Sequence, residues 1–405
     1  MRLNNFCFLV LMSLVFVSSF AQETPPPKDP TGAVRQRGSA EWLMNQGHEQ
    51  LNFKKYNEAI ESFSQALALN PKLIMAYHGL TMTYLRLSNF SKAQETAEKA
   101  LAADPNDFNA HLAQAKVYIA LNQTGNAIKS YEKVTQLAPN FSLGFYDLGT
   151  AYARTDKLAE AVGALQESIR LNPNWVGAHM NLALTYFQLK KDDEGMAELK
   201  AALKVEPNAF FAAEKLGREG IRLGRYNDAL QGYDVLSHAP MDPQFCQNVA
   251  FAMLYSGKGE FAARSAEECL QLKGRQDRSA PYLALFQHLG WRVAKNEKMA
   301  SLALANSEIF NLSASNISGQ WPLPVVKYLR RELSAEDLLK QAGNNDEQTE
   351  ARAYLGYDLS LSGKLNEATP HLRWVKEFGN RNFVEYPLAV LELHRIEEAK
   401  TKSIK

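Results

Sequence analysis

Cysteine is scarce in this sequence, which contains three among 405 residues. A disulfide-dense scaffold and a cysteine-rich zinc or iron–sulfur site are therefore excluded. An excess of one charge is also lacking, because 45 basic residues balance 44 acidic ones and leave a formal net charge of +1. This balance argues against a broad surface for nucleic acid or anionic membranes. With 46% apolar and 22% charged residues, the composition is that of a folded soluble protein.

The motifs of the common enzyme classes are missing as well. The chain has no P-loop, no dinucleotide-binding glycine pattern, no Gly-x-Ser-x-Gly elbow and no His-Glu-x-x-His pair. Its eight histidines are scattered, and we expect His111 and His179 to be packed rings rather than a metal pair. An undescribed site in residues 278–320 is the enzymatic alternative, but that stretch offers no paired carboxylates and no nucleophile with a base. We therefore expect no enzyme activity, no metal and no cofactor.

Long apolar runs are lacking except near the first residue. Twelve residues from Phe6 to Val17 are apolar apart from Ser13, and Ser19-Phe20-Ala21 is a small-x-small pattern. Because a membrane span needs about 20 apolar residues, we interpret residues 1–21 as a secretory signal peptide rather than an anchor. The mature protein is then exported, periplasmic or secreted, without a transmembrane segment.

A proline-rich stretch follows in residues 22–38. It has scattered charges and no apolar period, which is typical of a flexible linker.

Several residue types then recur every 34 residues. The recurring columns are Pro71, Pro105, Pro139, Pro173 and Pro207; Ala59, Ala93, Ala127 and Ala161; Gly47, Thr81, Ala115, Gly149, Ala183 and Gly217; and Tyr84, Tyr118, Tyr152 and Tyr186. A proline ends a helix, and small residues on two helices let them approach closely. The columns therefore predict antiparallel helix pairs, with the small residue of the first helix opposite the alanine of the second. Such pairs stack into an all-α solenoid.

These columns resemble the tetratricopeptide repeat (TPR) family over residues 39–277. The resemblance implies a right-handed α-α superhelix of seven units, with a register slip of one residue before the seventh. The units are expected to begin near Ala40, Ile74, Phe108, Ser142, Val176, Phe210 and Pro243. Residues 278–320 are expected to form a degenerate helical pair, around 282–294 and 298–307, and a loop.

A second set of motifs lies in residues 321–400. It comprises Trp321-Pro322-Leu323-Pro324, then Glu350 to Gly356, and Asn382 to Tyr386. In this order they resemble the C-terminal part of bacterial NlpI-type TPR proteins. That resemblance implies an adaptor, often dimeric, that binds envelope proteases and peptidoglycan hydrolases. NlpI-type proteins are typically lipoproteins, whereas no lipobox surrounds Cys7. We prefer a cap over a binding role for this region, because a solenoid needs its last apolar face covered.

The TPR resemblance also places the binding residues. In this family the first helix of each unit lines a concave groove, and the fifth, sixth, ninth and twelfth places of a unit face it. The candidate protein-binding residues are Met44, Asn45, His48, His78, Met82, Leu112, Lys116, Tyr146, Met180, Asn181, Leu184 and Phe187. The set is mainly apolar, and its methionines adapt to varied partners. The alternative is that neighbouring helices or a second copy cover some of these residues.

Two cysteines, Cys246 and Cys269, lie in the seventh unit, one on each helix. In an antiparallel hairpin these positions should face each other. Helix axes about 8–10 Å apart permit a disulfide without requiring it. Export to an oxidising compartment allows the bond, and two small buried thiols are the alternative.

The sequence thus predicts a non-enzymatic exported scaffold or adaptor that binds proteins or peptides in an apolar groove. It predicts no nucleic-acid partner and leaves a homodimer open. The alternative function, from a different class, is a self-associating structural component of the cell envelope.

Overall fold

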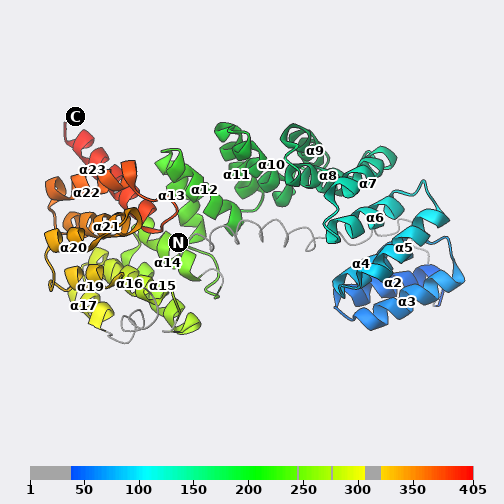
Figure 1. Ribbon diagram of the computed structural model, residues 1–405, viewed down its shortest axis with the longest axis horizontal. Coiled ribbons are helices and arrows are strands. Elements are labelled where there is room, and N and C mark those ends of the chain that lie inside the picture. Colours follow the sequence, from blue (N-terminus) through cyan, green and yellow to red (C-terminus); the bar gives the residue numbers. More distant parts are fainter. Residues whose placement is uncertain (1–37, 244–245, 275–276, 306–320, 405) are drawn as a thin grey trace. The chain divides into compact units, whose positions relative to one another are not determined.

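The computed structural model describes residues 38–243, 246–274, 277–305 and 321–404 (Figure 1). Within these ranges the chain forms 21 helices and no strand, so the all-α fold is confirmed. The expected signal peptide, nearly all of the linker and the loop after residue 305 lie outside the described residues. The chain divides into two compact units, residues 1–198 and 199–405.

Each unit consists of helices connected by short turns. The first unit holds α2 (Ala40–Asn52), α3 (Tyr56–Leu69), α4 (Ile74–Arg86), α5 (Phe90–Ala103), α6 (Phe108–Ala120), α7 (Thr124–Leu137), α8 (Ser142–Arg154), α9 (Leu158–Leu171), α10 (Val176–Gln188) and the start of α11 (Asp192–Val205). The second holds α12 (Phe210–Arg222), α13 (Tyr226–Leu236), α14 (Cys246–Tyr255), α15 (Gly259–Lys273), α16 (Ala280–Val293), α17 (Glu297–Ala305), α19 (Leu323–Leu329), α20 (Ala335–Gln341), α21 (Asn345–Leu361), α22 (Leu365–Phe378) and α23 (Glu385–Ile404).

The helix boundaries follow the repeat columns closely. The first helices α2, α4, α6, α8, α10 and α12 begin at the six residues expected from the 34-residue period. The second helices α3, α5, α7, α9 and α11 each end two residues before the recurring proline. The residue before a proline is disfavoured in the helical region, so the proline fixes the length of each pair.

The turn inside each pair has a repeated backbone conformation. A residue with positive φ recurs every 34 residues, at Lys54, Ser88, Asn122, Asp156, Lys190 and Gly224, and then at Gly257 after the expected slip of one residue. A left-handed residue directly after a helix lets the chain reverse while the last carbonyls still accept hydrogen bonds. In the first turn the Lys55 amide donates to the Gln50 carbonyl at 2.8 Å. The 34-residue period therefore reflects the conformation of the turns as well as the packing of the helices.

The column of small residues has a more specific role than we expected. A Cβ atom on Gly149 would lie 3.2 Å from the Ala161 carbonyl oxygen, as the predicted pairing requires, but only 2.7 Å from Leu165 Cγ. A Cβ on Gly217 would likewise lie 2.6 Å from the Tyr233 ring. The glycines at Gly149 and Gly217 therefore make room mainly for a large side chain, one helical turn beyond the column alanine.

The tyrosine column ties consecutive pairs together. The Tyr152 hydroxyl donates to Glu132 at 2.7 Å, and the Tyr186 hydroxyl accepts from Gln166 at 2.9 Å. In both cases the partner lies 20 residues earlier, on the second helix of the preceding pair. The column thus contributes a polar contact as well as bulk.

The C-terminal region packs back on earlier helices of its own unit. The helix α23 lies against α21 and α22 and also contacts α12 and α14. The Tyr255 hydroxyl on α14 donates to the Val384 carbonyl at 2.5 Å. The Trp321 indole donates to the Glu350 carboxylate at 2.6 Å. Trp321 therefore has a hydrogen-bond partner inside the unit.

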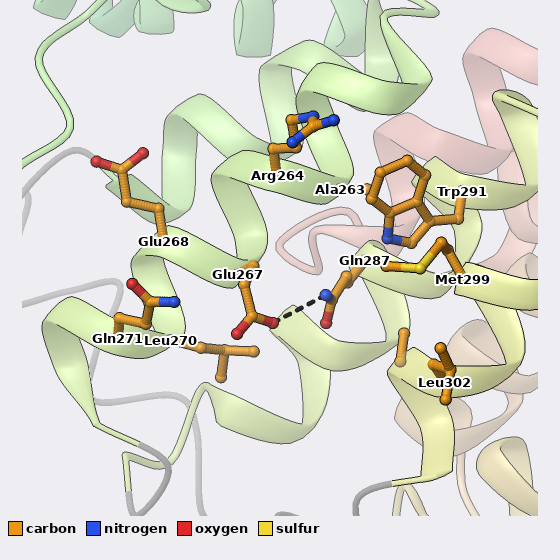
Figure 2. A pocket seen from close by; sticks show the side chains of 11 residues that line it. Ala263, Arg264, Glu267, Glu268, Leu270, Gln271, Gln287, Trp291, Met299 and Leu302 are labelled. Atoms are coloured by element: carbon orange, nitrogen blue, oxygen red, sulfur yellow. Dashed lines mark hydrogen bonds between the residues drawn. The ribbon is translucent and has the colours of Figure 1, made fainter. Parts of the chain in front are cut away.

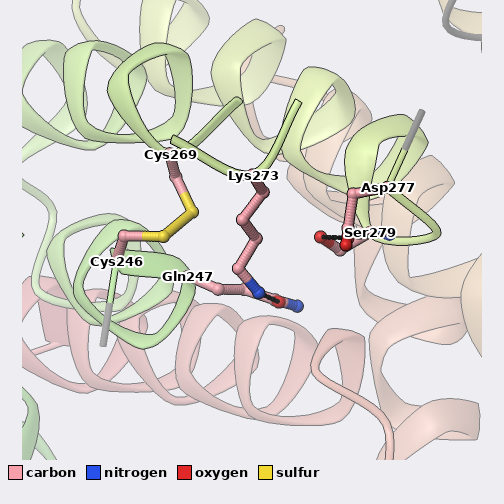
Figure 3. The surroundings of a disulfide bond; sticks show 6 residues. All are labelled: Cys246, Gln247, Cys269, Lys273, Asp277 and Ser279. Carbon is pink, nitrogen blue, oxygen red and sulfur yellow. Dashed lines mark hydrogen bonds between the residues drawn. A yellow bond between two sulfur atoms is a disulfide. The ribbon is translucent and has the colours of Figure 1, made fainter. Parts of the chain in front are cut away.

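A disulfide joins Cys246 on α14 to Cys269 on α15, with 5.3 Å between their Cα atoms (Figure 3). Both cysteines are fully buried. The Lys273 side chain reaches across the same two helices to Gln247 at 3.2 Å (Figure 3). The bond closes a loop of 23 residues and so restricts the unfolded chain.

We expect replacement of both Cys246 and Cys269 by alanine to lower the free energy of unfolding of the second unit by about 2–4 kcal/mol. Thermal unfolding with and without dithiothreitol measures this effect. The reductant should destabilise the wild type and leave the double variant unchanged. Equal stability of both proteins under oxidising conditions would contradict the prediction.

Candidate protein-binding face

Several first helices of the first unit contact one another directly, and the Lys116–Asp147 ion pair joins α6 to α8. Helix α4 contacts α2 and α6, and α10 contacts α8, whereas each second helix lies between its own first helix and the next one. Successive first helices therefore share a face that the second helices do not cover. We call the exposed side of α2, α4, α6, α8 and α10 the first-helix face.

Four of the candidate binding residues lie in the hydrophobic core instead of on this face. They are Met44, Met82, Leu112 and Tyr146, all of which are buried. Met44 and Met82 share one cluster around Phe63, and Tyr146, 2% exposed, lies 4.3 Å from the Trp175 ring. The expectation that these four side chains face a ligand needs correction, because neighbouring helices of the array cover them.

The other eight candidates are less deeply buried, although the Nε2 atoms of His48 and His78 are themselves buried. They are Asn45 and His48 on α2, His78 on α4, Lys116 on α6, and Met180, Asn181, Leu184 and Phe187 on α10. On α10 the residue Leu184 lies three positions after Asn181 and four after Met180, so it is a neighbour of both on the helix surface. This apolar stripe with one amide is the part of the face best suited to a partner.

Phe187 also packs against the next helix and so contributes to the fold. Its ring lies over Gly195 on α11, where a Cβ atom would approach the ring to 2.6 Å. The aromatic residue and the glycine therefore fit together across the turn between α10 and α11. A charged residue at Phe187 would disturb this hairpin, so that position is unsuitable for a test of binding.

Polar side chains connect neighbouring first helices along the face. Lys116 on α6 forms an ion pair of 2.7 Å with Asp147 on α8, with the two side chains 11% and 5% exposed. Asn181 on α10 donates to the Thr150 hydroxyl on α8 at 3.0 Å. In both pairs the residues are 31 positions apart. That spacing, three short of the repeat, brings side chains together on adjacent first helices.

We call His78, Lys116, Asp147, Thr150 and Asn181 the polar track. Its net charge is close to zero at pH 7. Burial, and then the positive charge of Lys116, lower the pKa of His78 to about 4. The imidazole is therefore uncharged at neutral pH, and the charges of Lys116 and Asp147 compensate each other. His78 and the Lys116–Asp147 pair thus add no net charge to the face at neutral pH.

The histidines at a shared repeat position have a packing role, as expected. His111 Nε2 lies 2.9 Å from the Pro105 carbonyl oxygen, and His179 Nε2 lies 3.0 Å from that of Pro173. Each ring therefore donates to the column proline that precedes its helix. His179 also contacts Glu198 at 2.6 Å, and this hydrogen bond raises its pKa against the opposing effect of burial.

The described part of the chain contains no group of three or more His, Cys, Asp or Glu side chains arranged to hold a metal ion. None of its described helices combines the length and apolar character needed to cross a membrane.

Gly79 on α4 provides a test of the packing between α4 and the neighbouring helices α2 and α3. A Cβ atom at Gly79 would clash with Cζ of the fully buried Phe63 ring and lie 3.0 Å from His48 Cε1. We expect Gly79→Ala to lower the free energy of unfolding of the first unit by about 1–2 kcal/mol, despite the better helix propensity of alanine. Urea unfolding measures the change.

Gly163→Ala is the matched control, because a Cβ at Gly163 on α9 meets nothing within 4 Å. This substitution should stabilise by about 0.5–1 kcal/mol. Effects of the same sign at Gly79 and Gly163 would show that the glycine is not needed for close packing.

Comparison with known proteins gives the family of these repeats. Models of the tetratricopeptide repeat match residues 51–117, 108–141 and 146–209. No curated protein matches the chain.

Similar solved structures include YrrB, described as a TPR protein with an unusual peptide-binding site. Its sequence is 20% identical, the match covers 44% of this chain and 93% of YrrB, and the TM-score is 0.36. TTC0263, a thermophilic TPR protein in Thermus thermophilus, is 21% identical, with 47% and 99% covered and a TM-score of 0.38. MamA 41-end from Desulfovibrio magneticus RS-1 is 19% identical, with 42% and 96% covered and a TM-score of 0.37. The family models alone identify tetratricopeptide repeats in residues 51–141 and 146–209.

Proposed function

We propose that this protein is a non-enzymatic scaffold whose first-helix face binds a protein or peptide. The observation that carries the proposal is the half-buried stripe of Met180, Asn181 and Leu184 beside the neutral polar track. Apolar side chains at the surface of a soluble domain favour an interface. Because the track has no net charge, the partner segment is itself apolar and uncharged where it contacts the face.

The second unit shows that a first helix of this chain can be covered by other segments of the same chain. At the ninth place of the seventh repeat, Phe251 on α14 is 3% exposed and packs 4.1 Å from the Phe286 ring. The helix α23 also contacts α14. In the first unit the ninth-place residues His48, Lys116, Thr150 and Leu184 are half-buried, whereas Met82 at the same place is buried. The first helix α14 is thus covered by other segments of the same chain.

The finer part of the proposal is an adaptor outside the cytoplasm. The signal-peptide pattern of residues 1–21 is its main support, and the Cys246–Cys269 bond fits an oxidising compartment. The resemblance of residues 321–400 to NlpI-type proteins suggests envelope proteases or cell-wall hydrolases as partners. Self-association as a structural component of the envelope is the competing proposal.

Affinity capture from the envelope fraction tests the proposal. The baits are the wild type, a variant with Met180→Glu and Leu184→Glu, and a control with Leu69→Glu. Leu69 is 61% exposed on the second helix α3, so its change adds a similar charge away from the face. We expect wild type and control to capture the same protein and the double variant to lose it.

Circular dichroism confirms folding of each bait, and light scattering measures its mass. Retention of the partner by a folded double variant would contradict binding at the first-helix face. A concentration-dependent mass of the wild type that the double variant abolishes would favour self-association instead.

A further inference from the structure

A separate hollow of about 680 Å³ lies in the second unit, between α15, α16 and α17 (Figure 2). Its size falls within the range of about 300–1,000 Å³ that is usual for ligand sites. It is formed by the second helix of the seventh repeat and the two helices that follow, and is thus distinct from the first-helix face.

The two sides of the hollow differ in chemistry. Figure 2 shows the polar side chains of Glu267, Glu268 and Gln271 on α15 along one side, and Trp291, Met299 and Leu302 along the other. Leu302 is 54% exposed at the rim. One side is therefore suited to a polar or cationic group and the other to an aliphatic one.

The Trp291 indole carries an unused hydrogen-bond donor at this site. The residue is 8% exposed, and its Nε1 atom is buried without a hydrogen-bond partner among the described residues. Leaving a buried N–H unpaired costs free energy, so an acceptor supplied from outside would be stabilising. Met299 packs against the cluster that contains Trp291, and its flexible side chain can move aside for such an acceptor.

Charge favours a cationic occupant. Two carboxylates, Glu267 and Glu268, line the hollow against one guanidinium, that of Arg264. Arg264 is already bonded to Glu260 at 2.8 Å and lies over the Trp291 ring. Glu267 accepts from Gln287 at 2.8 Å and keeps its second oxygen for another donor. The lining is therefore acidic overall.

We propose that this hollow binds a short peptide segment that contains a lysine next to an aliphatic residue. The lysine ammonium contacts Glu267, with the negative charge of Glu268 nearby, the aliphatic side chain lies on Met299 and Leu302, and a backbone carbonyl of the peptide accepts from Trp291 Nε1. The site is independent of the first-helix face, so either can fail without the other.

Tryptophan indole signals in a ¹⁵N-labelled protein test this directly. The chain contains five tryptophans, and the Trp291→Phe variant identifies the signal of interest. The probes are two pools of hexapeptides, blocked at both ends, with a fixed central Leu-Lys or Leu-Glu. We expect the Leu-Lys pool alone to shift the Trp291 signal, and added salt to weaken its binding.

Variants at the two sides separate the contributions. Leu302→Lys, at an exposed position, should weaken binding of the Leu-Lys pool by about ten-fold. Leu69→Lys in the first unit should leave it unchanged. The combined change Glu267→Gln and Glu268→Gln should abolish the preference for lysine. Equal shifts with both pools, no shift of the Trp291 signal, or unchanged binding to Leu302→Lys would each overturn the proposal.

Discussion

Replacing Asp358 by alanine is expected to lower the free energy of unfolding of the second unit by about 3–5 kcal/mol. The Asp358 carboxylate on α21 is buried and forms ion pairs with Arg292 on α16 and with Arg331 after α19, the latter at 2.8 Å. It also accepts from the Tyr328 hydroxyl at 2.9 Å. Burial opposes ionisation, but the two guanidiniums and the hydroxyl hold the pKa of Asp358 below its usual value. Its removal leaves Arg292, whose side chain is 7% exposed, without that buried counter-charge.

Urea unfolding of wild type and Asp358→Ala measures this loss. Lys340→Ala is the matched control, since the Lys340–Glu336 pair is exposed on both sides and should contribute less than about 1 kcal/mol. A loss at Asp358 no larger than at Lys340 would show that the network does not hold α16, α19 and α21 together.

The substitution Glu385→Gln is expected to stabilise the second unit increasingly as the pH rises from 5 to 8. Glu385, at the start of α23, and Glu350, on α21, are both buried. Burial raises the pKa of Glu385 to about 7, and burial together with the neighbouring Glu385 raises the pKa of Glu350 well above its usual value. Tyr354 donates to Glu385 at 3.0 Å, which satisfies one oxygen only.

The direction follows from proton binding. An unfolded glutamate has a pKa near 4.5, so between pH 4.5 and about 7 the folded state holds a proton on Glu385 that the unfolded state has lost. Stability therefore falls as the pH rises through this window, by about 3 kcal/mol for Glu385 alone. Glu350 adds to the loss in the same direction. Glutamine at position 385 stays neutral, so the variant does not lose the part of the stability that ionisation of Glu385 removes.

Other ionisable groups surround the pair and must be considered. Tyr282 on α16 and Tyr255 on α14 interact with the pair, as does Asp346 at the start of α21, while Glu347 acts on Tyr282. The tyrosines have raised pKa values and stay protonated over this range. In the first unit, His78 has the opposite effect, because its lowered pKa makes stability rise with pH between about 4 and 6.5.

Urea unfolding at pH 5, 6, 7 and 8 therefore compares Glu385→Gln with the wild type, so that the contribution of His78 cancels in the difference. The difference should be small at pH 5 and grow toward pH 8. A difference that stays constant with pH would mean that Glu385 does not titrate in this range.

The repeat columns in the sequence predicted most of the first unit. A proline every 34 residues fixes where second helices end, and the same period fixes where first helices begin. Glycine, lysine, serine, asparagine and aspartate all occur at the left-handed turn position, so no single residue type marked it. The six coincident helix starts show that packing and turn geometry obey one period.

The depth of a side chain was harder to predict than its direction. Met82 and Tyr146 occupy places that face the groove in the repeat pattern, yet close contact between adjacent first helices covers both. The Lys116–Asp147 and Thr150–Asn181 pairs could have been predicted, because their shared spacing of 31 residues follows from the repeat.

The buried groups of the second unit had no such signal. Asp358 and its partner Arg292 are 66 positions apart, and Glu350 meets Tyr282 across 68. These pairs depend on how α16 and α21 pack after the regular period has ended. A 34-residue pattern contains no information about them.

Site-specific photo-crosslinking tests the central claim of a protein-binding first-helix face most directly. A benzophenone amino acid would replace Leu184 on α10 in one protein and Leu69 on α3 in another, and both would be irradiated in the envelope fraction. The account predicts a covalent adduct with a second protein from position 184 and none from position 69. Adducts from position 69 alone, or equally from both positions, would contradict it.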